Sequence, residues 1–167
     1  MADERTTEEA DFGTFGKADF RAEREALGLS IKDMAEQVGV APITMRRWEK
    51  PREWSIPPDV RQKLDELRDR FDEACDRTAD ELETHAALSG NPPGPVVLPY
   101  YRDEGEWEAY GPGIAGTGLP FGFANAVARE CAAAARALGI PVRYAYAREL
   151  EEHPDECPAG VLVPIEL

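Results

Sequence analysis

Residues 27–49, LGLSIKDMAEQVGVAPITMRRWE, constrain the fold more than any other stretch, because they predict two short helices joined by a tight turn. Ser30 is placed to cap the first helix, and Asp33 completes a capping box with it. Gly39 can adopt the left-handed conformation that closes a helix, and Pro42 suits the first position of the next helix. The apolar side chains that recur at helical spacing, and so predict the buried faces, are Met34, Ala35, Val38, Met45 and Trp48.

This pattern resembles the helix-turn-helix of Cro and phage repressors, the XRE-like regulators. The resemblance is carried by Leu27-Gly28-Leu29-Ser30, Ala35, Gly39-Val40, Thr44, Met45 and Trp48-Glu49. It implies a lambda-repressor-like DNA-binding domain in which helix 42–50 enters the major groove. The chain departs from the family pattern at Ala41, where a serine cap is usual and its loss typically costs about 1 kcal/mol. It departs again at Lys50-Pro51, where the family usually has a glycine one residue later. An ordinary helical hairpin in a protein core is the alternative interpretation.

The resemblance also assigns roles to individual side chains. The residues expected at base edges are Pro42, Ile43, Arg46 and Arg47. The two arginines are the best base readers, since arginine can bind guanine O6 and N7 together. The residues expected to contact phosphates, which position the protein without reading sequence, are Ser30, Lys32, Thr44, Lys50 and Arg52.

A helix is expected over residues 17–27, and Arg24 lies on its apolar face with Phe20 and Leu27. The family resemblance implies a partner for this arginine, because a first-helix arginine commonly pairs with the glutamate that ends the recognition helix. Here that glutamate is Glu49. A solvated Arg24, with its stem along the apolar face, is the alternative.

Four segments are expected along the chain: a disordered acidic tail (1–16), a helix-turn-helix domain (17–70), the continuation of a long helix (71–89) and a small α+β domain (90–167). A continuous apolar stripe predicts the long helix: Val60, Leu64, Leu67, Phe71, Cys75, Thr78 and Leu82. Its first half should pack on the helix-turn-helix, and its second half against another element or another subunit. Trp54, in the loop 51–57, is expected to seal the core.

The turn-forming sequence SGNPPGP (89–95) marks the domain boundary. Beyond it the sequence predicts three strands (95–101, 140–147 and 160–167) and two helices (103–110 and 121–138). Pro99 predicts that the first strand is an edge strand or a bulged one. This order of parts resembles bacterial and phage regulators with a long fourth helix and a small C-terminal dimerisation domain, a group that includes repressors associated with anti-CRISPR operons.

The net charge of −14 opposes DNA binding, because DNA repels an anionic protein at long range. Residues 17–70, however, carry twelve Lys and Arg against eleven Asp and Glu, so this segment is +1 and the rest of the chain is −15. Modest affinity that falls quickly with salt is therefore expected. Three widely spaced cysteines without a C-x-x-C motif, the lack of a signal peptide and the lack of a long apolar run predict a cytoplasmic protein with no membrane partner.

The sequence therefore predicts a homodimeric, sequence-specific transcriptional regulator, a repressor that binds double-stranded DNA at an inverted-repeat operator. One alternative is the antitoxin of a toxin–antitoxin pair; another is an acidic protein-interaction module whose helix-turn-helix does not bind DNA. No enzyme activity, cofactor or metal is expected. GPGIAG (111–116) lacks the strand–turn–helix context of a nucleotide loop, and no second pair of ligands joins His153 and Cys157 to complete a zinc site.

Overall fold

The computed structural model describes residues 15–52, 54–111, 117–165 and 167. Most of the expected acidic tail and residues 112–116 of the GPGIAG loop lie outside the described residues. The helices are α1 (Lys17–Ala26), α2 (Ile31–Gln37), α3 (Pro42–Glu49), α4 (Pro58–Leu88), α5 (Glu104–Tyr110), α6 (Phe121–Ala137) and α7 (Ala147–Glu152), with a short 3-10 helix at Pro154–Glu156. The strands are β1 (Val96–Tyr100), β2 (Val142–Tyr146) and β3 (Val161–Leu162).

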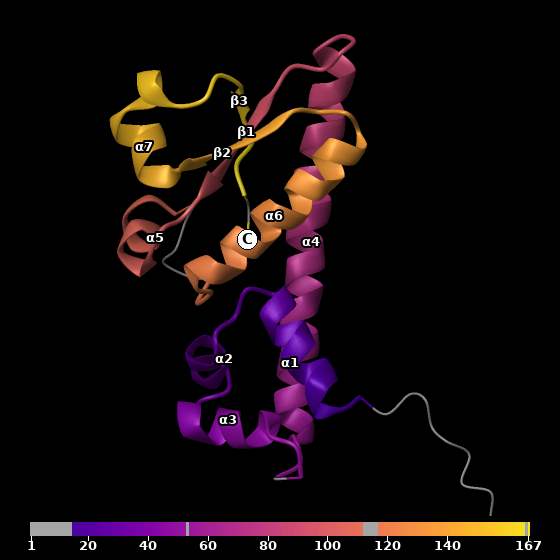
Figure 1. The fold of residues 1–167 in the computed structure, drawn as a ribbon, viewed down its shortest axis with the longest axis vertical. Helices are drawn as coiled ribbons and strands as arrows, with labels where there is room; N and C mark the ends of the chain where they lie inside the picture. The colour runs from indigo at the N-terminus through magenta and orange to yellow at the C-terminus, as the bar shows by residue number, and fades with distance from the viewer. Residues whose placement is uncertain (1–14, 53, 112–116, 166) are drawn as a thin grey trace, which may run out of the picture.

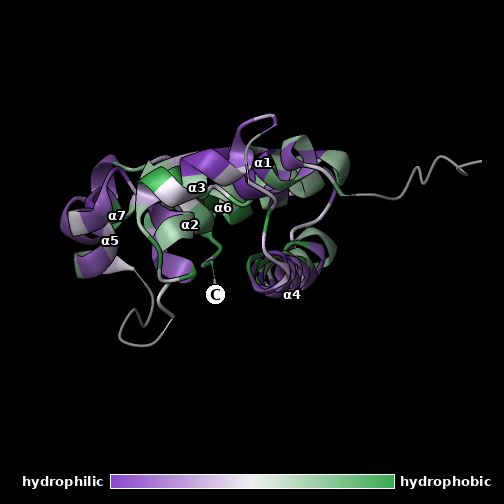
Figure 2. Cartoon of the chain, turned by 90° about the horizontal axis from the view of Figure 1, so that it is seen from below, coloured by the Kyte–Doolittle hydropathy of each residue, from purple (hydrophilic) through white to green (hydrophobic). Residues whose placement is uncertain are grey.

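The chain forms two units along one long helix (Figure 1). In the first unit α1 packs against α4 and α3, and α2 packs against α3; in the second unit α6 lies between α4 and the sheet, and α5 and α7 lie farther from α4. The large side chains that fill the first unit are fully buried: Phe20, Leu27, Leu29, Met34, Met45, Leu64 and Leu67. Helix α4 buries its apolar stripe and carries hydrophilic residues over much of its outer surface, as Figure 2 shows when α4 is seen nearly end-on.

Helix α6 covers the second half of the α4 stripe. The rings of Phe71 and Phe123 meet edge to face with 5.6 Å between their centroids, and Thr78 and Leu82 of α4 are also buried. The sequence left open whether this half of the stripe contacts another element or another subunit, and here the contact is within the chain. Ala74 is completely buried, whereas Cys75 lies at the margin of the stripe.

The sheet has the strand order β2-β1-β3, and both of its strand pairs are parallel. The expected sheet of about three strands in a mainly helical chain is present, but helices connect parallel strands, so the unit is α/β rather than α+β. The strand expected over 160–167 is reduced to the two residues of β3. Val161 and Val163 donate to β1, and the next bond of this ladder would need an N–H from Pro99, which proline lacks.

Strand β1 lies at the centre of the sheet, so the expectation of an edge strand from Pro99 was wrong. The carbonyls of Pro95 and Val97 accept hydrogen bonds from β3 and its extension, at 3.0 Å each. Backbone polar groups two residues apart face the same neighbouring strand, so those of Pro99 also face β3. The missing N–H of Pro99 therefore limits the pairing with β3 and leaves the pairing with β2 intact.

Helix α7 was not expected from the sequence, which gives it no local capping residue. Its first-turn amide, the N–H of Arg148, donates to the Glu106 carboxylate of α5 at 2.8 Å. The second oxygen of Glu106 accepts from the N–H of Arg102 at 2.7 Å. A buried glutamate that is distant in the sequence therefore supplies the cap.

The two units touch through backbone at one point. Gly28 ends the α1 region with φ = +71°, and a Cβ placed on it would lie 2.0 Å from the carbonyl oxygen of Gly122, in the first turn of α6. A Cβ on Gly122 would in turn lie 2.3 Å from the carbonyl oxygen of Gly28. Nearby, the side-chain amide of Gln37 donates to the carbonyl of Gly118 at 2.6 Å. Both glycines are required for this close approach.

Candidate nucleic-acid interface

Local signals set the positions of α2 and α3. The Ser30 hydroxyl accepts from the Asp33 N–H at 3.1 Å, and the Asp33 carboxylate accepts from the Ser30 N–H at 2.7 Å, which is the predicted capping box. Gly39 has φ = +70°, as the tight turn requires. Ala41 is the N-cap of α3 without a side-chain hydrogen bond, and Pro42 is the first helical residue.

A buried ion pair fixes α3 against α1. Arg24 Nε donates to one carboxylate oxygen of Glu49 at 2.6 Å, and Arg24 Nη2 donates to the other at 3.2 Å. The third guanidinium nitrogen donates to the Leu29 carbonyl at 2.5 Å. The side chains of Arg24 and Glu49 are only 5% and 7% exposed. This two-pronged geometry joins the two helices at a defined angle.

The opposite face of α3 is open to solvent. Met45 and Trp48 are buried beneath the helix, while Pro42, Arg46 and Arg47 are exposed. Ile43 is 53% exposed, which is unusual for a large apolar side chain at the start of a helix. The four residues predicted to contact bases therefore lie together on one accessible surface, with two guanidinium groups beside an apolar side chain.

Trp54 lies on the surface rather than in the core, so the expectation that it seals the core was wrong. It is 56% exposed, and the Arg47 guanidinium lies over its ring at 5.1 Å from the centroid. Lys17 holds this segment by donating to the backbone carbonyls of Lys50 at 2.7 Å and Trp54 at 2.6 Å. The hydrophobicity of tryptophan favours burial. Pro57 and Pro58, which follow in the sequence, do not indicate that Arg47 is the partner of Trp54.

The residues predicted to contact phosphates occupy different environments. Ser30 is exposed, and its cap uses the oxygen as acceptor, so the hydroxyl hydrogen can still be donated. Thr44 is half-buried in the first turn of α3. Lys50 and Arg52 follow the helix and are exposed, and Arg52 has φ = 61°, a left-handed conformation that is uncommon for a residue with a side chain.

Lys32 is separated from the other basic residues by its acidic surroundings. Its ammonium group lies 3.7 Å from the Glu36 carboxylate, and both side chains are well exposed. The pocket that contains Lys32 is also lined by Asp33, Glu104 and Glu108, the last two from α5. Burial, reinforced by the negative charge of Asp33, raises the pKa of Glu104. This acidic environment makes Lys32 the weakest of the predicted phosphate contacts.

The described residues contain no group of three or more His, Cys, Asp and Glu side chains placed to hold a metal ion. His153 and Cys157 are joined instead by a hydrogen bond from the thiol to the His153 carbonyl at 3.6 Å. Within the same described part of the chain, no helix has the length and apolar character needed to cross a bilayer.

No protein-family model matches this chain, and no curated protein matches its sequence.

Proposed function

We propose that this protein is a sequence-specific DNA-binding transcriptional regulator of the helix-turn-helix class, a repressor that binds as a homodimer with α3 in the major groove. The observation that carries the proposal is the exposed face of α3, where Ile43, Arg46 and Arg47 project away from the buried pair Met45 and Trp48. Arginine binds guanine through two hydrogen bonds, and an exposed aliphatic side chain suits the methyl group of thymine.

Preorganisation supports the same assignment. The pair of Arg24 with Glu49 fixes the angle of α3, and Trp54 restrains the guanidinium of Arg47 before any ligand arrives. A side chain that is ordered in advance loses less conformational entropy on binding. Arg47 is therefore the principal base reader, and Arg46, Lys50 and Arg52 supply positive charge around it.

The charge of the whole protein determines how this binding responds to salt. The net charge of −14 limits non-specific attraction to DNA, so stable binding depends on the contacts of α3. We expect binding that weakens steeply as salt rises, as for any protein that neutralises phosphates.

The test begins with selection of bound sequences from random double-stranded DNA, followed by titration of the selected duplex. Arg47→Ala should lose about 1–3 kcal/mol of discrimination between the selected duplex and a scrambled one. Arg52→Ala should weaken both duplexes alike and reduce the magnitude of the salt slope by about one unit per lost contact. Arg136→Ala is the matched control, because it removes the same charge from an exposed position on α6. An Arg47→Ala variant that behaves like Arg136→Ala would contradict the proposal.

The dimeric state is part of the proposal, because a single α3 reads too few base pairs for useful specificity. We place the subunit contact on the unit formed by residues 90–167. Val161 and Leu162, in the two-residue edge strand β3, are 53% and 50% exposed, and an apolar strand edge is a ready site for pairing with a second copy.

Light scattering on the full-length protein should give a dimer, and Leu162→Glu should shift it toward the monomer. Leu138→Glu is the control, since Leu138 is a comparably exposed apolar residue at the end of α6, away from that edge. A full-length monomer at about 10 μM, a concentration at which even modest subunit contacts are occupied, would refute the dimer.

A further inference from the structure

A groove opens on the sheet face beside α6, at the edge opposite β3. It has a volume of about 490 Å³ and is lined by Tyr100, Arg129, Tyr144, Ala145, Tyr146 and Glu149. This volume is within the range of small-molecule sites in proteins. Neither the DNA-binding face nor the proposed subunit contact includes any of these residues.

The register of the sheet explains why three tyrosines meet here. Leu98 pairs with Tyr144, and Tyr100 pairs with Tyr146, so all four side chains project from the same face. Helix α6 buries Leu98 but leaves the β2 side of this face uncovered, where Tyr144 is 37% and Tyr146 is 43% exposed. The Tyr100 and Tyr144 rings meet edge to face at 5.5 Å between their centroids. The result is an aromatic surface on one side of an open groove.

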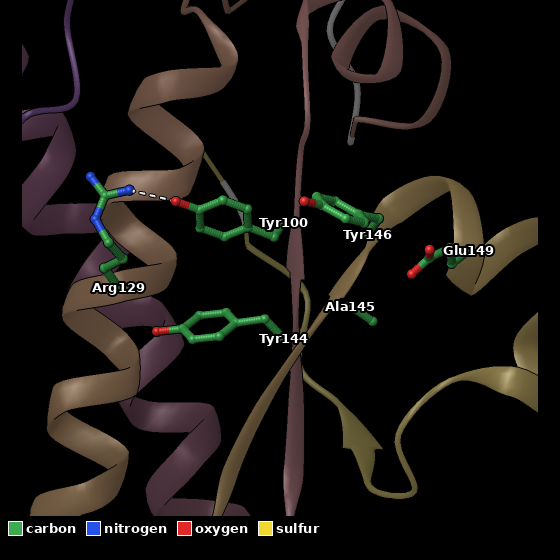
Figure 3. A pocket seen from close by; sticks show the side chains of 6 residues that line it. All are labelled: Tyr100, Arg129, Tyr144, Ala145, Tyr146 and Glu149. Carbon is green, nitrogen blue, oxygen red and sulfur yellow. Dashed lines mark hydrogen bonds between the residues drawn. The ribbon is translucent and has the colours of Figure 1, made fainter.

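Opposite charges stand at the two ends of this aromatic surface (Figure 3). On the α6 side, Arg129 Nη1 donates to the Tyr100 hydroxyl at 2.8 Å. On the α7 side, the Glu149 carboxylate points toward the groove. Among the residues that the structure describes, neither Arg129 nor Glu149 forms an ion pair, although Arg102 and Arg148 of the same unit each pair with a nearby carboxylate.

We propose that this groove binds a small planar aromatic molecule with a carboxylate at one end and an amine at the other. The tyrosine rings would contact the planar body by offset or edge-to-face stacking. The Arg129 guanidinium matches a carboxylate, which it can bind through two hydrogen bonds. The Glu149 carboxylate accepts from the amine. A phosphate monoester fits less well, because it would bring nearly two negative charges into a groove whose own charges cancel.

The proposal is independent of DNA binding and is tested on the full-length protein without DNA. Three probes separate the contributions: 4-(aminomethyl)benzoate carries one charged group at each end of its ring, 4-methylbenzoate lacks the amine, and 4-methylbenzylamine lacks the carboxylate. NMR titration would follow the backbone amides of residues 143–149. For 4-(aminomethyl)benzoate we expect a dissociation constant of about 1 mM, the value typical of a ligand of this size with a few polar contacts. Each of the other two probes should bind about tenfold more weakly.

Matched variants assign the ends of the groove. Arg129→Leu should weaken the binding of 4-(aminomethyl)benzoate and 4-methylbenzoate about tenfold, which corresponds to the loss of one charged contact, and leave 4-methylbenzylamine unchanged. Glu149→Gln should weaken 4-(aminomethyl)benzoate and 4-methylbenzylamine and leave 4-methylbenzoate unchanged. Arg136→Leu, on the same helix but outside the groove, is the control for a lost positive charge. Tyr144→Ala should weaken all three probes.

Three results would overturn the proposal. The first is no shift of the amides of 143–149 with any probe at about 10 mM, a concentration that would nearly saturate a 1 mM site. The second is an Arg129→Leu variant whose affinities equal those of Arg136→Leu. The third is a Tyr144→Ala variant that converts a dimer into a monomer while leaving probe binding unchanged, since the groove would then be a subunit interface.

Discussion

Replacing Glu49 by alanine is the most direct test of how α3 is held against α1. The change removes both oxygens that accept from Arg24 and leaves a guanidinium whose side chain is 5% exposed. Removing one partner of a buried ion pair costs about 3–5 kcal/mol, because the other charge stays buried. Two contacts remain for Arg24: the Leu29 carbonyl at 2.5 Å and the half-exposed Glu25 carboxylate at 3.4 Å. These residual contacts favour the lower end, a loss of about 3 kcal/mol.

Urea and thermal unfolding, followed by circular dichroism, would measure this loss. For a chain of this length, about 3 kcal/mol corresponds to a melting temperature lower by roughly 6–12 °C. Glu25→Ala is the control, because it removes an exposed carboxylate that also contacts Arg24, and it should lower the melting temperature much less than Glu49→Ala does.

A double variant separates the charge from the packing. Arg24→Met combined with Glu49→Leu removes both charges and keeps apolar volume, so it should recover much of the stability lost by Glu49→Ala. Equal melting temperatures for Glu49→Ala and the Glu25→Ala control would contradict the cost assigned to the buried charge. A double variant less stable than Glu49→Ala would contradict it too, since the cost would then come from lost packing.

Two predictions concern protons. Burial, with a smaller contribution from the Glu106 carboxylate, raises the pKa of Tyr101 to about 12. The folded protein keeps this proton to a higher pH than the unfolded chain, so the stabilisation is complete below pH 10 and is lost as pH rises toward 12. Over that interval the free energy of unfolding, measured by urea titration, should fall by about 2–3 kcal/mol more in the wild type than in Tyr101→Phe. A hydrogen bond with the Cys131 thiol, together with burial, raises the pKa of the Cys75 thiol. Because the thiolate is the reactive form, Cys75 should react with a disulfide reagent at pH 8 at least about tenfold more slowly than Cys157, and Cys157→Ser should remove the fast phase; a fast phase that survives in Cys157→Ser would contradict this.

The sequence predicted α2 and α3 closely because their boundaries depend on adjacent residues. The capping box of Ser30 with Asp33, the turn at Gly39 and the proline at position 42 act within one or two turns of helix. The apolar stripe of α4 could be predicted equally well, because helical periodicity persists over its whole length.

Contacts between residues far apart in the chain could not be predicted from the sequence. The Glu106 cap begins α7 from 42 positions away along the chain, and no local residue indicates it. The central position of β1 depends on pairing with β3, a distant segment that contacts β1 only before Pro99, so the proline wrongly predicted an edge strand. Trp54 was assigned to the core by its hydrophobicity, whereas the Arg47 side chain provides its contact. In the aromatic groove, alternation predicted a half-buried strand at 140–147, but the partners from α6 and α7 required the fold.

The contact between Gly28 and Gly122 fixes the distance between the two units of the chain at this point. Each glycine meets the other's carbonyl oxygen at a distance that leaves no room for even one methyl group. Larger side chains at these two positions therefore cannot increase the distance between the first turn of α6 and the end of the α1 region in small steps. In the proposed dimer, joined through the C-terminal units, the separation of the two α3 helices would be set by this contact and by α4. The packing of two glycines that touch no DNA would then help to determine the spacing between the operator half-sites.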